Sequence, residues 1–215
     1  SARRRLSGDK AMKKNHVIIG LTGQTGAGKT TVSEIFASHG FETINCDKTA
    51  RTVTADGSQC NKDLSGIFPE CFDSALSLDR RRLGQIVFND SDKLAKLNST
   101  IFPYIIKEIS KQINKLAAEG KKFILLDAPT LFEAGADKLC DTIVSCIAEE
   151  KIRTERIVSR DSISCELAKS RISSQKPDSF FIDNSDYIIR NNGSVSDAFA
   201  QTEHIIKQIK ERYDG

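Results

Sequence analysis

One octapeptide near the start of the chain limits the fold more than any other feature of the sequence. Residues 23–30, Gly-Gln-Thr-Gly-Ala-Gly-Lys-Thr, match the phosphate-loop pattern G-x-x-x-x-G-K-[ST] at every fixed position. The apolar run at 17–22 predicts a buried strand before the loop, and residues 31–37 have the apolar spacing of a helix, which we expect to end at Gly40. A strand, a glycine-rich turn and a helix in this order predict a site for the phosphates of a nucleoside triphosphate, because backbone N–H groups and the helix N-terminus face the anion.

Each part of this loop has its own expected contact. We expect Lys29 to reach the β- and γ-phosphates of ATP and the Thr30 hydroxyl to ligate Mg²⁺. The predicted ATP-binding residues are Gly23, Gln24, Thr25, Gly26, Ala27, Gly28, Lys29, Thr30 and Thr31. The loop therefore predicts nucleotide binding, and it leaves open what happens to the nucleotide.

Strands and helices are predicted to alternate along the rest of the chain. Strands are expected at 17–21, 42–45, 123–127, 142–148 and 187–190. The last helix is expected from Val195 to about Arg212, with Ser194 as its N-cap. Strands separated by helices predict an α/β fold, a P-loop NTPase-type parallel sheet flanked by helices.

Two segments are longer than a simple crossover between parallel strands requires. Helices expected at 62–68, 80–88, 91–98 and 102–118 predict a helical insert, and two more helices at 149–177 predict a small lid. The predicted organisation is a nucleotide-binding core at 12–47, 121–148 and 178–215, an insert at 48–120 and a lid at 149–177.

Composition narrows the class of protein further. The 215 residues fit one sizeable domain with insertions, and the net charge of +3 is too small to indicate a nucleic acid partner. No apolar run approaches the roughly 20 residues that span a bilayer, so no membrane association is expected. Six cysteines without C-x-x-C spacing are typical of reduced thiols in a soluble, cytoplasmic protein. Nothing in the sequence indicates the oligomeric state.

The first eleven residues are predicted to be a tail that precedes the natural start. They are basic and lack an apolar core, and Met12 is the only methionine of the chain. A basic arm for RNA or a transit peptide is the alternative interpretation.

Two aspartates follow predicted strands, at the sheet edge where ligands bind in open α/β folds. Asp47 follows the second strand, where it could take the proton from an attacking hydroxyl or could cap a helix at 48–53; position alone does not separate these roles. Asp127 closes the third strand in a Walker-B-like arrangement, which predicts contact with Mg²⁺ or Thr30. Glu133 is interpreted as the partner of Thr130 in a capping box.

Arginines are frequent in the predicted lid, and the insert contains a run of three. Arg153, Arg156, Arg160 and Arg171 could neutralise charge on a transferring phosphoryl group, and Arg171 is the best single candidate. Surface solubility is the alternative for each. The Arg80-Arg81-Arg82 run, with Asp79 as an expected cap, could hold an anionic acceptor or form a solvated turn.

Several stretches together resemble the dephospho-coenzyme A kinase family. They are Gly20 to Thr30, Ile44 to Asp47 with Ala50-Arg51, Leu78 to Phe88, Leu126 to Pro129 with Leu131 to Glu133, Arg171-Ile172 with Gln175, and Asp186 with Asn191 to Gly193. The R-R-x-L-G-x-I-V-F and P-x-L-F-E stretches are much more discriminating than the phosphate loop. The resemblance covers essentially everything from Met12 onward.

The resemblance implies transfer of the ATP γ-phosphate to the ribose 3′-hydroxyl of dephospho-coenzyme A, with ATP and Mg²⁺ as cofactors. It implies Asp47 as the base, Lys29 and Arg171 as further catalytic residues, and Thr30 with Asp127 as metal ligands. The insert is implied to bind the acceptor, and the implied acceptor contacts are Arg51, Arg81, Leu83, Phe102 and Pro103.

The chain departs from the family pattern at two positions. Asn45 replaces the first acid of the usual D-x-D, so a Mg²⁺-related or orienting role of that acid is not expected here. Phe102 replaces the histidine of the usual H-P, so weaker or altered acceptor contacts are expected, with the chemistry retained. Two other functions compete with this one. Another small-molecule or nucleoside kinase shares the loop and lid, and a nucleotide-switch protein is disfavoured because no N-K-x-D motif is present.

Overall fold

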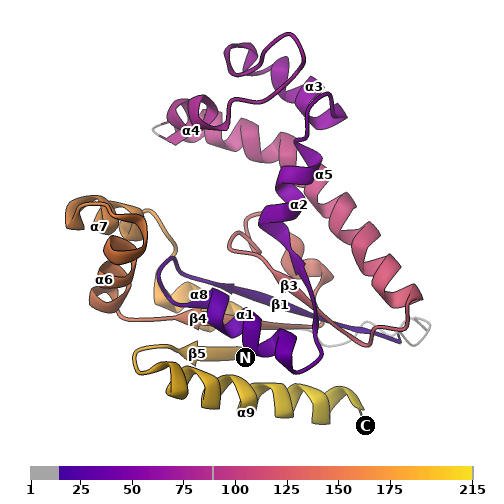
Figure 1. The fold of residues 1–215 in the computed structure, drawn as a ribbon, viewed down its shortest axis with the longest axis vertical. Helices are drawn as coiled ribbons and strands as arrows, with labels where there is room; N and C mark the ends of the chain where they lie inside the picture. Colours follow the sequence, from indigo (N-terminus) through magenta and orange to yellow (C-terminus); the bar gives the residue numbers. More distant parts are fainter. Residues whose placement is uncertain (1–14, 89, 215) are drawn as a thin grey trace. The chain divides into compact units, whose positions relative to one another are not determined.

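The computed structural model describes residues 15–88 and 90–214 (Figure 1), so the predicted tail and Met12 lie outside the described residues. The chain divides into two compact units. The first contains the residues up to Thr43 and those from Leu116 onward, and the second contains Ile44–Lys115. We call them the nucleotide unit and the helical unit and describe each by itself.

A five-stranded parallel sheet forms the centre of the fold, in the order β2-β3-β1-β4-β5. Its strands are β1 Val17–Gly23, β2 Glu42–Asn45, β3 Phe123–Asp127, β4 Thr142–Ile147 and β5 Tyr187–Arg190. All seven residues of β1 are buried, as expected for a central strand covered on both faces. The predicted α/β class is confirmed.

Helices α1 (Lys29–Ser38) and α9 (Val195–Asp214) pack together on one face of this sheet (Figure 1). Their apolar side chains share one core with alternate residues of β1, which is the period-2 pattern of a strand. Helix α1 is followed by Gly40, whose φ of +85° suits the left-handed turn expected there. Helix α9 begins after Ser194, whose hydroxyl accepts the Asp197 N–H at 3.2 Å and so caps the helix as predicted.

Three helices and a short 3₁₀ turn complete the nucleotide unit. They are η2 Ala136–Leu139, α6 Glu150–Asp161, α7 Cys165–Ser173 and α8 Asp178–Asn184. The predicted lid corresponds to α6 and α7, which pack on each other through Ile157, Ala168 and Ile172. Helix α8 was not expected from the sequence. The capping box predicted at Thr130 and Glu133 is wrong, because residues 129–135 form a series of turns and no helix starts there.

The helical unit has its own apolar core. Its elements are α2 Cys46–Val53, α3 Gln59–Ser65, η1 Pro69–Cys71, α4 Arg80–Phe88 and α5 Ser91–Ala118. The core side chains come from α3, η1, α4 and Phe68, which lies between α3 and η1, with partly buried residues of α5 packed against them. Asp79 caps α4 as predicted, because its Oδ1 accepts the Arg82 N–H at 2.9 Å.

Helix α5 runs without the interruption that the sequence led us to expect between 98 and 102. Pro103 lies inside it and removes one main-chain donor, which ordinarily favours a break or kink. The buried side chains Ile105, Ile109 and Ile113 follow at intervals of four and form a continuous apolar stripe. Burial of that stripe offsets the lost hydrogen bond. Helix α3 also begins three residues earlier than predicted, because the Ser58 hydroxyl caps it.

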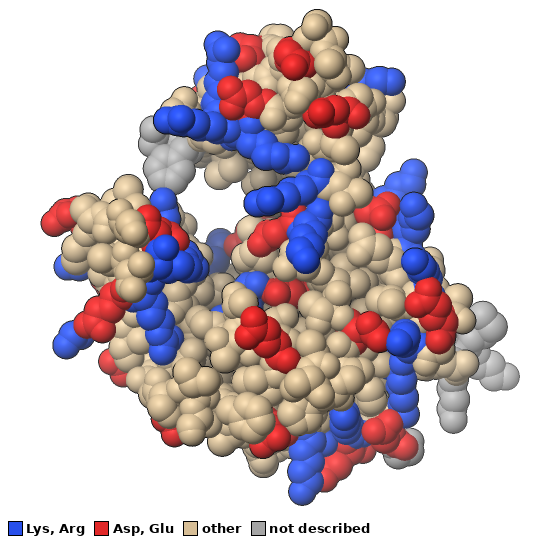
Figure 2. All heavy atoms as spheres, viewed as in Figure 1, with Lys and Arg blue, Asp and Glu red and all other residues tan. Residues whose placement is uncertain are grey.

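Surface composition agrees with the small net charge. Basic and acidic side chains are interspersed over the face shown in Figure 2. Within the part of the chain that the structure describes, no helix is both long enough and apolar enough to cross a bilayer.

Candidate active site

The loop between β1 and α1 has the backbone conformation of a phosphate cradle. Gly23 (φ +152°) and Gly28 (φ +90°) both adopt conformations that residues with a Cβ rarely take. A Cβ at Gly23 would lie 2.2 Å from the Cys146 carbonyl oxygen, and one at Gly28 would lie 2.2 Å from Asn191 Nδ2. Glycine is therefore required at both positions, for its φ and for its lack of a side chain.

Unpaired donors gather where α1 begins. In the described part of the chain, no acceptor bonds the main-chain N–H groups of Gly26, Gly28, Lys29 or Thr30. These groups stand at the N-terminus of α1, where the helix dipole adds partial positive charge. An arrangement of this kind binds phosphate oxygens.

The predicted catalytic lysine and the predicted metal ligand are in contact. Asp127 ends β3 beside Leu21 of β1, and its Oδ1 accepts a hydrogen bond from Lys29 Nζ. Both side chains are largely buried, at 17% and 8% exposure. The pair holds Lys29 at the loop, and it leaves the second oxygen of Asp127 available.

The remaining loop residues differ in their surroundings. Gln24 is buried, and its Nε2 donates to Asp178 Oδ1 at 2.7 Å. The Thr25 N–H donates to Gln175 Oε1 at 2.9 Å, so this amide does not face a ligand. Thr30 is exposed and Thr31 is half-buried, both in the first turn of α1. The described residues hold no group of three or more His, Cys, Asp and Glu side chains that could bind a metal without help.

The lid arginines have two kinds of environment. Arg153 and Arg156 donate hydrogen bonds to main-chain carbonyls of the phosphate loop, so both side chains face its backbone. Arg160 and Arg171 both pair with Asp161, Arg171 Nη1 at 2.7 Å. Hydrogen bonds and charge from these two arginines hold the pKa of Asp161 below its usual value.

Asp47 is not the cap of the helix that follows β2. Asn45 occupies that position, and its side chain accepts the Lys48 N–H at 2.9 Å. Asp47 lies in the first turn of α2 with its side chain exposed. The capping alternative for Asp47 is therefore wrong, and the residue that replaces the family's first acid is the one that caps the helix.

The five predicted acceptor residues all belong to the helical unit. Arg51, Arg81 and Pro103 are exposed, Phe102 is half-buried, and Leu83 is 6% exposed within the core of the unit. Leu83 thus packs the core and has little surface for direct contact with a substrate.

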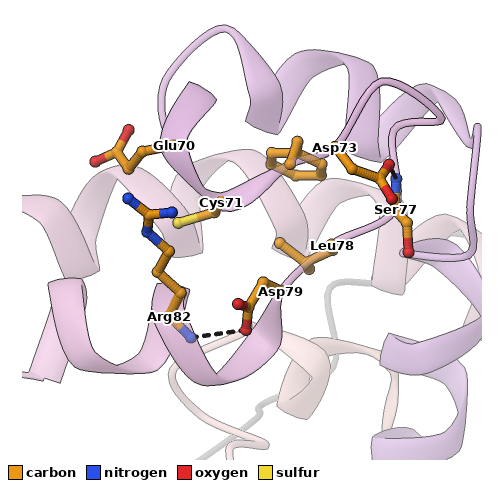
Figure 3. Close-up of a pocket in the computed structure, with 8 residues that line it drawn as sticks. Glu70, Cys71, Asp73, Ser77, Leu78, Asp79 and Arg82 are labelled. Carbon is orange, nitrogen blue, oxygen red and sulfur yellow. Dashed lines mark hydrogen bonds between the residues drawn. The ribbon is translucent and has the colours of Figure 1, made fainter.

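A pocket of about 300 Å³ lies within the helical unit (Figure 3). Three carboxylates, Glu70, Asp73 and Asp79, line it together with a single guanidinium from Arg82. Its excess of negative charge makes it a poor match for the diphosphate of a coenzyme A precursor. None of the five predicted acceptor residues lines this pocket.

Some residues that contact the phosphate loop were not expected to do so. Asn191 follows β5, Cys146 lies in β4, and Arg153 lies in α6; all three bond loop carbonyls. One signal was available for Asn191, because a polar residue directly after a strand lies at the ligand-binding edge of a parallel sheet. Cys146 has no such signal, since it lies within a strand and not directly after one.

The parallel sheet, the phosphate loop after β1 and the acid that ends β3 define a P-loop kinase of the α/β class. Comparison with known proteins makes the assignment specific. The family model for dephospho-CoA kinase matches residues 17–197. The chain belongs to the dephospho-CoA kinase family, whose members catalyse the final step of coenzyme A synthesis.

Individual relatives agree with this assignment. A dephospho-CoA kinase from Fusobacterium nucleatum is 36% identical over 193 residues, which cover 90% of this chain and 98% of the relative. Among solved structures, TT1252 from Thermus thermophilus has a TM-score of 0.76 at 26% identity and covers 90% of this chain and 97% of its own. Dephospho-CoA kinase from Campylobacter jejuni has a TM-score of 0.58 at 27% identity, with 91% and 98% covered.

Proposed function

We propose that this chain transfers the γ-phosphate of ATP to the ribose 3′-hydroxyl of dephospho-CoA. The observation that carries the proposal is the set of unpaired N–H groups at the start of α1, next to Lys29, in a chain of the dephospho-CoA kinase family. In the reaction, the 3′-oxygen forms a bond to the γ-phosphorus, and the bond from that phosphorus to the β–γ bridging oxygen breaks. The hydroxyl proton leaves with a base, and ADP is released.

The phosphate loop holds the donor. The N–H groups of Gly26, Gly28, Lys29 and Thr30 bind phosphate oxygens. The ammonium of Lys29 leaves its hydrogen bond to Asp127 and stabilises the negative charge that develops on the β- and γ-phosphates. This exchange requires only a side-chain rotation, since Lys29 already lies at the loop.

Thr30 and Asp127 are the proposed ligands of Mg²⁺. Magnesium is held in such sites by one or two protein oxygens together with substrate phosphates, which fits an exposed Thr30 hydroxyl and the second oxygen of Asp127. When bound, the ion supplies positive charge at the phosphates.

Asp47 is the proposed base. Its carboxylate is exposed and is not used to cap α2, so it is available to accept the proton of the 3′-hydroxyl. We propose Arg171 as a lid residue that releases Asp161 and contacts the transferring phosphoryl group. Residues 48–120 are the proposed acceptor-binding insert and 149–177 the proposed lid. The six cysteines show no C-x-x-C spacing, as is typical of reduced thiols, and this supports a cytoplasmic location.

A panel of acceptors tests the function. ADP release from ATP is measured with dephospho-CoA, nucleosides, nucleotides and small sugars, and we expect rapid release with dephospho-CoA alone. Rapid turnover of another acceptor, or release that depends on none, would contradict the proposal.

Asp47→Asn tests the base. Turnover should fall by about 10²- to 10⁴-fold, while the affinity for ATP stays unchanged. Asp56→Asn is the matched control, because it makes the same change at another exposed aspartate of the helical unit. If Asp47→Asn keeps the turnover of the control, Asp47 is not the base.

A further inference from the structure

Three consecutive carbonyls of the phosphate loop accept hydrogen bonds from side chains that the loop motif does not include. The bonds are Arg153 Nε to Thr25 O at 3.0 Å, Arg156 Nη1 to Gly26 O at 3.4 Å, Asn191 Nδ2 to Ala27 O at 2.8 Å and Cys146 Sγ to Ala27 O at 3.0 Å. The donors come from α6, from β4 and from the residue after β5. The outer side of the loop is therefore held by parts of the chain more than a hundred residues away.

These contacts act on the amides that face a ligand. In a trans peptide unit the C=O of one residue and the N–H of the next point in opposite directions. A donor that holds the Ala27 carbonyl outward therefore turns the Gly28 N–H inward, and one that holds the Thr25 carbonyl does the same for the Gly26 N–H. Both of these N–H groups lack an acceptor among the described residues, as expected if they face a bound phosphate.

Asn191 is fixed firmly enough to orient the loop. Its own N–H donates to the Ile147 carbonyl at 2.9 Å, which continues the β4–β5 ladder, and the residue is 7% exposed. Its Nδ2 lies so close to Gly28 that no Cβ fits between them. Cys146 adds a second donor to the same carbonyl, and burial raises the pKa of its thiol to about 12, so the S–H proton is retained at neutral pH.

Arg153 holds the other peptide unit in a comparable way. It is 4% exposed, and its Nη2 donates to Gln175 Oε1 at 2.8 Å. The same Gln175 oxygen accepts the Thr25 N–H, so the side chains of Arg153 and Gln175 hold both main-chain groups of Thr25. Burial lowers the pKa of Arg153, because a buried cation loses its hydration. The fold therefore bears a desolvation cost to place this guanidinium against a neutral carbonyl.

We propose that Asn191 and Arg153 are positioning residues for the donor phosphates: they hold the Ala27 and Thr25 carbonyls outward and thereby aim the Gly28 and Gly26 N–H groups at the anion. They act through the loop and do not touch the nucleotide. The inference rests on the proposed function only in that a triphosphate is the ligand of the loop.

Binding of inorganic tripolyphosphate, measured by calorimetry without any acceptor, tests the proposal. We expect Asn191→Ala to weaken tripolyphosphate and ATP binding about tenfold, the equivalent of about one well-aligned hydrogen bond. Asn192→Ala is the matched control, because Asn192 is exposed and its side chain bonds Glu149 instead of the loop. In steady-state assays the KM for ATP should rise while the KM for dephospho-CoA stays unchanged.

A second pair of variants guards against misfolding of the first. Arg153→Met should weaken tripolyphosphate binding, and Arg153→Lys, which retains the charge and a donor, should restore part of it. If the Asn191 and Asn192 variants bind tripolyphosphate equally, or if Arg153→Met binds it as the wild type does, the proposal is wrong. Because no acceptor is present, weakened binding would support the inference even if dephospho-CoA proved not to be the acceptor.

Discussion

Replacement of Gly28 by alanine should lower the free energy of unfolding by more than the strained backbone conformation alone explains. An alanine at φ +90° costs about 1 kcal/mol relative to glycine. Its Cβ would also lie 2.2 Å from Asn191 Nδ2, so Asn191 must move and its hydrogen bond to Ala27 is lost, which costs about 1 kcal/mol more. The expected destabilisation is about 2 kcal/mol, or a fall in Tm of about 4–8 °C for a chain of this length.

Gly40→Ala provides the matched control for this variant. Gly40 has a similar φ of +85°, but a Cβ there would meet nothing within 4 Å. Calorimetry of the ligand-free proteins should therefore show a Tm lower by about 2–4 °C for Gly40→Ala, with activity retained. In the Gly28→Ala, Asn191→Ala double variant the clash is absent, so the combined loss should be smaller than the sum of the single losses. Equal losses for Gly28→Ala and Gly40→Ala would refute the reasoning.

Three further predictions concern other parts of the molecule. Alkylation followed by mass spectrometry at pH 8 should label exposed Cys165 quickly and Cys146 at least about 10³-fold more slowly, because a pKa raised from 9.0 to about 12 depletes the thiolate at that pH; comparable labelling would contradict that environment. Arg171→Ala should lower kcat about 10³-fold with little change in Tm, since its ion pair with Asp161 is only partly buried, and unchanged kcat would remove Arg171 from the proposed site. Leu64→Ala should destabilise the helical unit by about 2–5 kcal/mol in denaturant unfolding, with ATP affinity retained, and a loss of ATP affinity would contradict the separation of the two units.

Local pattern was sufficient for most of the sheet. Strands β2, β3 and β5 begin and end where the sequence predicted. Strands β3 and β5 contain short apolar runs, whereas β2 has only one buried apolar residue, Ile44, and ends at the residue that caps α2. Helix α5 was predicted as two helices, at 91–98 and 102–118, whereas the structure has one continuous helix with Pro103 inside it. Its buried side chains Ile105, Ile109 and Ile113 all follow the proline. Burial of a long stripe outweighs one missing hydrogen bond, and a local rule does not include that balance.

The roles of individual polar residues were harder to predict than the elements that carry them. Asp47 and Asn45 are both good capping residues, and only the observed start of α2 shows that Asn45 is the cap. Two arginines of the predicted lid have different surroundings although they are the same residue type. Arg153 is buried against the phosphate loop, and Arg171 pairs with Asp161. A sequence pattern gives the charge of such residues, but the packing of α6 and α7 selects their partners.

The sequence by itself determined the α/β class, the phosphate loop and the family, because these depend on residues adjacent in the chain: a strand, a glycine-rich turn, a lysine and a helix. Only the tertiary structure decided how that loop is held. Thr25 and Ala27 are fixed by Arg153, Cys146 and Asn191, whose donors reach the loop from more than a hundred residues along the chain. The direction of a main-chain amide depends on what bonds the carbonyl behind it, and that partner is set by which strands and helices the fold places next to each other.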